Sequence, residues 1–453
     1  MAIDVLTRTR GHIDKYFGVS SNGSTVKREL MAGTVTFLAM SYVLAVNPSV
    51  LGDHGVLGEL GIPTQAVFTA TAVAAVFGTL VMGLWAKYPV ALAPGMGLNA
   101  FFAYSVVLGM GIPWQVALSG TFLSGVIFFI LAVTKVRERI LNAIPMQMKL
   151  AVGAGIGMFV AFLGLKNAGI VVANEATFVA LGDFTEGTTL IALFGLVVTV
   201  VFVVLGWHGA VLYGIVLTTI VGMISGLVDL PNGIAALPRG LDETFGQAII
   251  HLPDAFTGQM IVVVLTMLFV DFFDASGTLI GVANQAGLLD KDGKLPRAAS
   301  ALAADSVGTT AGAIIGTSTT TAYVESTAGV SAGGRTGLTA VATAGWFAVA
   351  MFCFPVFEVV AKSGAVSSAA LIVVGVLMAR SLGEIDWQRL EFAVPAFITI
   401  IMMPLTYSIA NGLAMGMLFY PVVMVAKGKI KEVHPAMWAL MVIFLGYFFF
   451  LAE

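Results

Sequence analysis

The sequence has 453 residues, of which 58% are hydrophobic and 10% charged, with a formal net charge of −3 at pH 7. Soluble domains carry about 25% charged residues, so this composition predicts a membrane protein and gives no sign of a nucleic-acid partner. One cysteine, Cys353, excludes a disulfide scaffold, and the five histidines lack ligand spacing, so we expect no metal site and no cofactor.

Hydrophobic segments follow one another along the whole chain. A helix of about 20 apolar residues crosses the hydrocarbon core of a bilayer. The pattern therefore predicts an all-α, multi-pass membrane protein with about 14 transmembrane helices, and the last segment either crosses the membrane or lies along its surface. The segments occupy residues 30–50, 66–86, 90–109, 114–134, 149–166, 189–206, 210–228, 259–286, 298–315, 316–334, 337–357, 366–380, 390–407, 411–426 and 435–451.

Basic residues mark alternate connections between these segments. Lysine and arginine gather within residues 1–29, 135–149, 288–297 and 427–431, whereas loops such as 175–186 are acidic. Because cytoplasmic loops carry the excess of lysine and arginine, we expect a protein of the cytoplasmic (inner) membrane whose N-terminus faces the cytoplasm.

Two segments differ from the other spans, namely 90–109 (VALAPGMGLNAFFAYSVVLG) and 316–334 (GTSTTTAYVESTAGVSAGG). Both are rich in Gly, Ala, Ser, Thr and Pro rather than in Leu and Val. Each follows two long spans in its own half of the chain, and the second half starts on the opposite face of the membrane. This is the pattern of an inverted repeat, whose paired interrupted helices indicate a binding site at the middle of the membrane. The alternative is that both are glycine-rich packing helices.

An interrupted segment predicts an extended piece followed by a half-helix. Such backbone must line protein or a water-filled cavity at membrane depth. The free N–H groups at the start of a half-helix carry partial positive charge and can hold an anion or a carbonyl oxygen. We expect these groups at residues 99–102 in the first copy and at residues 324–326 in the second.

Two acids interrupt a long apolar run in the stretch MLFVDFFDASGT. In a helix Asp271, Asp274 and Thr278 share one face, and that face must point to a pocket, because a charge in lipid is costly. Glu325 lies at the predicted start of the second half-helix. The alternative is that the two aspartates form a buried structural pair. For Asp305, a lone acid on a glycine-lined face, a structural hydrogen-bonding role is at least as good an explanation.

Three motifs resemble the nucleobase–cation symporter-2 family, also called nucleobase–ascorbate transporters, and are closest to its AzgA-like purine permease branch. They are ALAPGMGLNAFF at 91–102, FVDFFDASGTLIGVANQAGLLDKDGKLPRA at 269–298 and TTTAYVES at 319–326. The resemblance covers essentially the whole chain. It implies fourteen helices in two inverted seven-helix repeats, with a short strand in helices 3 and 10. The implied ranges are 1–29 for a cytoplasmic N-terminal segment, 30–134 and 257–357 for the core domain, and 135–230 and 363–453 for the gate domain.

The resemblance also implies binding residues. In the family an acid of helix 8 and a glutamate of helix 10 bind the nucleobase, and by motif these match Asp271 and Glu325. Asn99 matches a polar residue of helix 3 in the branch, and Asp274 matches a second acid of helix 8. Uracil-type relatives carry a histidine where this sequence has Ala275, so their proton route does not carry over.

The chemistry of a purine fits such a pocket. A carboxylate accepts hydrogen bonds from adjacent N–H groups of the base, half-helix N–H groups donate to its acceptors, and phenylalanine rings can stack on it. Desolvation and a nearby like charge favour the protonated form of an acid, which can then carry a co-transported proton. The candidate substrate-binding residues are Asp271, Glu325, Asn99, Phe101, Phe102, Thr278 and Val324, and the candidate proton-coupling residues are Asp274, Asp271 and Glu325.

These observations predict a secondary active transporter, not an enzyme, that imports guanine, hypoxanthine or adenine by proton symport with elevator-like alternating access. A homodimer through the gate domain is implied by the family alone. A transporter of another neutral nucleobase, such as uracil or xanthine, or of a Na⁺-coupled metabolite shares every physical feature above. An intramembrane aspartyl protease is excluded because no Gly-x-Gly-Asp occurs, and an anion transporter is disfavoured by the acids.

Overall fold

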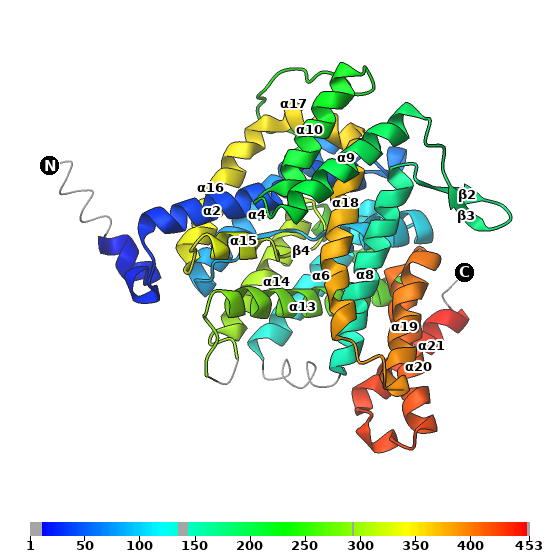
Figure 1. The fold of residues 1–453 in the computed structure, drawn as a ribbon. Helices are drawn as coiled ribbons and strands as arrows, with labels where there is room; N and C mark the ends of the chain where they lie inside the picture. Colours follow the sequence, from blue (N-terminus) through cyan, green and yellow to red (C-terminus); the bar gives the residue numbers. More distant parts are fainter. Residues whose placement is uncertain (1–10, 135–143, 292–293, 451–453) are drawn as a thin grey trace.

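The computed structural model describes residues 11–134, 144–291 and 294–450, so most of the predicted basic loop at 135–149 lies outside the described residues (Figure 1). The protein is mostly helical, at 73%. Within the described part, ten helices are long and apolar enough to cross a membrane, and four apolar helices are shorter. The prediction of a helical, multi-pass membrane protein is confirmed at this level.

Prolines and capping side chains fix where many helices begin. α4, α6 and α8 start directly after Pro63, Pro113 and Pro145, since proline fits the first turn but not the interior of a helix. The hydroxyls of Thr257 and Ser408 cap α13 and α20 by accepting a backbone N–H of the first turn.

The elements of the first half, in chain order, are η1 (Ser20–Asn22), α2 (Val26–Met40), α3 (Val43–Leu51), η2 (Gly58–Leu60), α4 (Thr64–Val81), η3 (Met82–Ala86), β1 (Leu92–Pro94), α5 (Met96–Ala100), η4 (Phe101–Gly109), α6 (Trp114–Val133), α8 (Met146–Asn167), β2 (Val171–Asn174), β3 (Phe178–Leu181), α9 (Gly187–Val204) and α10 (Ala210–Ile224). Those of the second half are α11 (Leu241–Thr244), α12 (Gln247–Ile250), η5 (Leu252–Ala255), α13 (Gly258–Gln285), α14 (Ala298–Ile315), β4 (Thr320–Ala322), α15 (Ser326–Ser331), α16 (Gly337–Ala350), η6 (Met351–Cys353), α17 (Phe354–Lys362), α18 (Gly364–Met378), η7 (Ala379–Glu384), α19 (Leu390–Leu405), α20 (Ile409–Ala426), η8 (Ile430–Glu432) and α21 (Pro435–Phe450).

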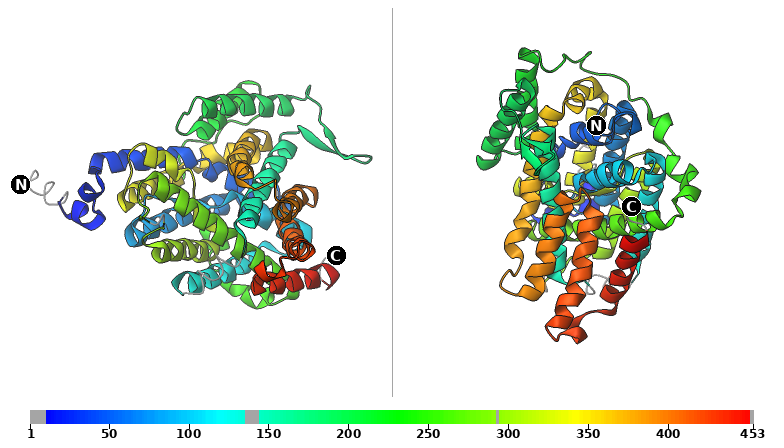
Figure 2. Two further views of the ribbon diagram at one scale, coloured as in Figure 1. Left: turned by 60° about the horizontal axis from the view of Figure 1, so that its bottom comes forward. Right: turned by 90° about the vertical axis from the view of Figure 1, so that its right-hand side faces the viewer.

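The long helices pack in two groups. In one group α14 packs against α4 and α6, and α16 packs against α2 and α4. In the other, α8 packs against α18 and α19, α9 packs against α10 and α18, and α19 packs against α20, as Figure 2 shows from two sides. Small residues allow close contact within the second group: a Cβ on Gly375 of α18 would lie 2.5 Å from the Gly157 carbonyl oxygen of α8.

Two small sheets accompany the helices. β1 pairs with β4, and β4 lies near the centre of the helical body (Figure 1). β2 and β3 form a hairpin that projects from the body and that the sequence analysis does not predict. Its turn is held by the Asn174 side chain, whose oxygen accepts the amides of Ala176 and Thr177.

Candidate functional site

The two interrupted segments meet at the strand pair. β1 and β4 are antiparallel, with Ala93 opposite Thr321. The Tyr323 hydroxyl also donates to the Pro94 carbonyl oxygen at 2.5 Å. Non-helical backbone at membrane depth needs partners within the protein, and each strand supplies them to the other.

A cavity lies beside this strand pair. It contains about 560 Å³ of atom-free space, part of it open to solvent. One wall is formed by Gly95 and the start of α5, by β4 and the residues before α15, and by α13. The opposite wall comes from α8 and α18. The cavity therefore lies between the two groups of helices.

Two carboxylates face the cavity, Asp274 from α13 and Glu325 from the residues before α15. Both side chains are half-buried. The Tyr42 hydroxyl donates to Glu325 Oε1 at 2.7 Å and so holds this carboxylate in place. In the described lining there is no lysine, arginine or histidine, so the cavity repels anions and suits a neutral ligand with hydrogen-bond donors.

The first half-helix begins earlier than expected from the sequence. α5 starts at Met96, and the amide of Asn99 already donates to the Gly95 carbonyl at 2.8 Å, so the expected free N–H groups at 99–102 are wrong. The first turn of a helix has no internal acceptor for its amides, and here that turn includes Gly97 and Leu98, which line the cavity.

The second half-helix fits its prediction in part. Val324 and Glu325 line the cavity directly before α15. The amide of Ser326, the last residue of the predicted range, instead donates to the Tyr323 carbonyl at 3.1 Å.

Asp271 lies three residues before Asp274 on α13 but does not line the cavity. It is fully buried, and its Oδ2 lies 2.9 Å from the Thr309 hydroxyl oxygen. The same hydroxyl lies 2.9 Å from the carbonyl oxygen of Thr320 in β4. The role of Asp271 in substrate binding remains a prediction.

Asp305 accepts hydrogen bonds from β4. Its Oδ1 accepts the Ala322 amide at 2.8 Å and the Thr321 hydroxyl at 3.4 Å. The side chain is fully buried and does not line the cavity. These contacts favour the structural explanation, because the acid pairs a backbone group of β4 that would otherwise lack a partner.

The other predicted residues divide between the cavity and its surroundings. Thr278 and Val324 line the cavity. Asn99, Phe101 and Phe102 are buried and do not line it. The Asn99 side-chain oxygen accepts the hydroxyl of Ser318, which ties α5 to the chain entering β4. The stacking role of the two phenylalanines and the binding role of Asn99 remain predictions.

Several residues that line the cavity were not predicted from the sequence. Ile156 of α8 and Val374 and Met378 of α18 form the wall opposite the acids, and their apolar sequence gives no signal. Tyr42 had one usable signal: it is a hydroxyl-bearing residue in the middle of the first span, where a polar group needs a partner.

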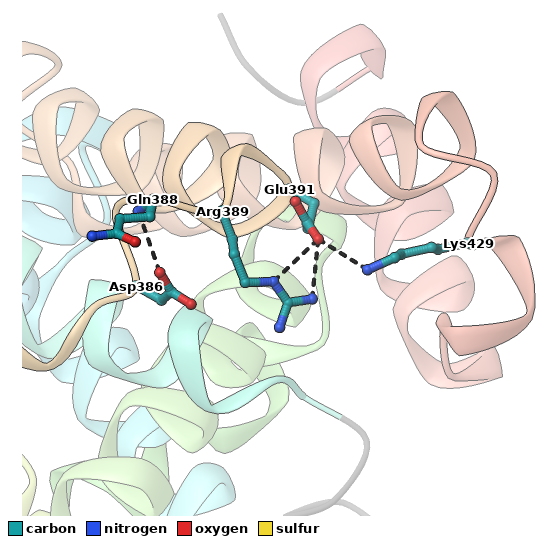
Figure 3. A network of polar contacts seen from close by, with 5 residues as sticks. All are labelled: Asp386, Gln388, Arg389, Glu391 and Lys429. Atoms are coloured by element: carbon teal, nitrogen blue, oxygen red, sulfur yellow. Dashed lines mark hydrogen bonds and ion pairs between the residues drawn. The ribbon is translucent and has the colours of Figure 1, made fainter.

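Glu391, an acid outside this cavity, has charged partners. Glu391 at the start of α19 accepts the Arg389 guanidinium at 3.0 Å and the Lys429 ammonium at 2.9 Å (Figure 3). Asp386 is nearby in the chain and accepts the amide of Gln388. The Glu391 charge is therefore compensated by two cations, whereas Glu325, Asp271 and Asp305 have neutral hydroxyl or N–H partners. In the described residues we find no cluster of acids, histidines and cysteine suited to a metal ion.

Comparison with protein families matches the model described as "Permease family" (Xan_ur_permease) to residues 27–415. Among curated relatives, the guanine/hypoxanthine permease PbuG of Bacillus subtilis (strain 168) is 54% identical over 439 residues, covering 96% of this chain and 99% of the relative. The adenine permease AdeP of Escherichia coli (strain K12) is 40% identical over 439 residues, covering 97% and 96%.

Solved structures show the same fold at low identity. The transmembrane domain of the cyanobacterial bicarbonate transporter BicA matches with a TM-score of 0.60 and 16% identity, covering 85% of this chain and 97% of that one. The structure of SLC26A9 matches with a TM-score of 0.61 and 10% identity, covering 93% and 69%. At such identity the likeness concerns the fold alone.

Proposed function

This chain belongs to the permease family of the nucleobase–cation symporter-2 type, and from that premise we propose that it imports purine nucleobases across the cytoplasmic membrane. It is a permease and not an enzyme. The substrates in the names of its relatives support the proposal, with guanine and hypoxanthine at 54% identity and adenine at 40%. Guanine and hypoxanthine are therefore the first candidates.

The observation that carries the proposal is the pair of carboxylates in a cavity without cations. Guanine and hypoxanthine are neutral and present adjacent N–H donors beside carbonyl and ring-nitrogen acceptors. Asp274 and Glu325 would accept the N–H groups, and the first amides of α5 would donate to the acceptors. A hydrogen bond to a charged group contributes about 1.5–3 kcal/mol, which is enough for micromolar binding when several act together.

Asp271 is the proposed carrier of a co-transported proton. The Thr309 hydroxyl has one proton, yet it lies within hydrogen-bond distance of both Asp271 Oδ2 and the Thr320 carbonyl. Both contacts are hydrogen bonds at the same time only if Asp271 is protonated and donates to Thr309, which then donates to Thr320. Proton entry would be driven by about 2.3 kcal/mol per 100 mV of membrane potential.

Transport itself is proposed to proceed by an elevator-like movement. The chain would form fourteen helices in two inverted repeats, with residues 30–134 and 257–357 as the core and 135–230 and 363–453 as the gate. The cavity has the acids on its core side and Ile156 and Val374 on its gate side, so displacement of the core against the gate would change which side the ligand reaches. The N-terminus would be cytoplasmic, and the gate domain would form a homodimer.

Uptake into proteoliposomes tests the proposal. Radiolabelled guanine, hypoxanthine, adenine, uracil and xanthine would each be offered under an imposed proton gradient and, separately, a sodium gradient. We expect saturable, proton-driven accumulation of guanine or hypoxanthine, with competition by unlabelled purines. Uptake of uracil or xanthine alone, or accumulation that follows sodium, would favour the alternative transporter instead.

A further inference from the structure

A second cavity, which shares no lining residue with the acidic one, is lined by four cations. It contains about 590 Å³ of atom-free space, including its open mouth. Its cations are Lys15, Lys87, Arg297 and Arg335, and its described lining contains no carboxylate. Like charges at close range repel, so a chain gathers four of them around one space only at a cost that a bound anion would relieve.

The four cations come from distant parts of the sequence and lie at the ends of membrane spans. Lys15 precedes the span that begins at Val26, and Lys87 directly follows the span that ends at Ala86. Arg297 directly precedes the span from Ala298, and Arg335 lies two residues before the span from Gly337. The cavity is therefore at the membrane surface, on the side of the N-terminal segment.

Two of these cations are hydrogen-bonded to neutral backbone carbonyl groups. Lys87 donates to the Tyr16 carbonyl oxygen at 2.9 Å and lies 4.2 Å from the centre of the Tyr16 ring. The Arg335 guanidinium donates to the carbonyl oxygens of Val330 and Gly334. Among the described residues none of the four cations takes part in an ion pair.

Carboxylates in the same segments are occupied by other donors. Asp14 accepts the amide and the hydroxyl of Ser20 at 2.7 and 2.8 Å, which keep the pKa of this acid below its usual range. Glu29 accepts the backbone amides of Arg335 and Thr336 at 3.0 and 3.2 Å, so it positions the loop of Arg335 without contacting the guanidinium.

The backbone at Lys87 places its side chain beside the N-terminal segment. Its φ is 59°, in the left-handed region that residues with a side chain rarely adopt. This conformation ends η3 and turns the chain so that the lysine lies against Tyr16. A left-handed residue commonly ends a helix, so this conformation accounts for the direction in which the chain leaves η3.

The surroundings of the cavity are apolar on one side. Leu84 and Trp85, just before Lys87, are 41% and 48% exposed, and the Tyr16 hydroxyl donates to the Leu84 carbonyl at 3.0 Å. Tryptophan and tyrosine are enriched where a protein crosses the membrane surface. A molecule that joins a phosphate to acyl chains would satisfy the cations and this apolar surface together.

We propose that the cavity lined by Lys15, Lys87, Arg297 and Arg335 binds a phosphate group, supplied by the headgroup of an anionic phospholipid. Basic pockets between helices at a membrane surface are suited to such headgroups. A bound headgroup would connect the N-terminal segment with the ends of α14 and α16.

The test uses the full chain in nanodiscs of phosphatidylcholine, with and without phosphatidylglycerol. The informative variant is Lys15→Gln with Arg297→Gln, because both side chains are exposed and make no side-chain hydrogen bond in the described structure. The matched control is Lys427→Gln with Lys431→Gln, which removes the same charge from the exposed loop after α20. Bound lipid is counted by native mass spectrometry, and the melting temperature is recorded beside it.

We expect phosphatidylglycerol to be retained and to raise the melting temperature of the wild type and the control. In the cavity variant its apparent affinity should fall about 30-fold, at about fivefold per lost cation. Inorganic phosphate is tested in parallel in phosphatidylcholine alone; stabilisation by it that the cavity variant loses would keep the phosphate site and assign it to a soluble anion. Equal retention in the cavity variant and the control, or no effect of either ligand, would overturn the proposal.

Discussion

Two groups of buried acids in this protein differ in what surrounds them. Glu391 in α19 is paired with Arg389 and Lys429, so its charge is balanced within the structure (Figure 3). Asp271 and Glu325, at the strand pair, have only the hydroxyls of threonine and tyrosine as side-chain partners.

The partners of a buried acid determine whether it can bind a ligand or a proton. An acid balanced by two cations gains little from a ligand, because its hydrogen-bonding capacity is already used. An acid with neutral partners at membrane depth costs free energy, and a ligand or a proton can offset that cost. The comparison therefore separates an acid that stabilises the fold from the acids that we propose to act in transport.

The largest expected effect comes from Glu325→Gln. The amide retains an oxygen that can accept the Tyr42 hydroxyl, so the local structure should persist, but the charge that receives the purine N–H groups is lost. We expect guanine binding to weaken by about 2 kcal/mol, or about 30-fold. Calorimetry on the purified protein measures it, and an unchanged affinity would remove Glu325 from the site.

A smaller effect is expected from Gly97→Ala, which alters the contact between α5 and α8 beside the cavity. A Cβ on Gly97 would lie 2.5 Å from Ile156 Cγ2 of α8, so Gly97→Ala overpacks this contact. Such strain costs about 1–3 kcal/mol, and we expect purine uptake to fall about tenfold.

The matched control for this prediction is Gly153→Ala on α8, where the nearest atom to an added Cβ is 3.7 Å away. It should leave uptake near the wild-type rate. Adding Ile156→Ala to Gly97→Ala should restore much of the lost uptake, and a failure of this rescue would show that the contact is not what limits transport.

The smallest expected effect on binding is that of Glu391→Gln. The substitution removes the negative charge that Arg389 and Lys429 share, so the melting temperature should fall. Guanine affinity should stay within about twofold of the wild type, because Glu391 does not line the cavity. A large loss of guanine affinity with an unchanged melting temperature would contradict the distinction between Glu391 and the acids at the strand pair.

Much of this molecule could be predicted because its signals are local. Apolar segments predicted the long spans, and the predicted span 298–315 coincides with α14. The motif resemblance added the short strands, which the pairing of β1 with β4 bears out. The β2–β3 hairpin was missed because it rests on a single Asn174 turn in an acidic loop.

The details of the site could not be predicted, for a geometric reason. Asp271 and Asp274 are three residues apart, so they differ by about 60° around a helix. Periodicity places both on one side of α13 but cannot say which one faces the cavity and which packs toward Thr309. The gate-side wall, including Ile156, depends on distant packing that no local pattern records.

The most direct test of the account compares guanine binding by Asp274→Asn and Asp271→Asn in calorimetry of the purified protein. We expect Asp274→Asn to bind guanine at least about tenfold more weakly than the wild type, because the ligand loses an acceptor within the cavity. We expect Asp271→Asn to bind guanine nearly as well as the wild type but to lose proton-driven accumulation in proteoliposomes. Normal binding by Asp274→Asn together with abolished binding by Asp271→Asn would contradict this expectation. It would indicate that Asp271, the acid that the family resemblance favours, binds the substrate.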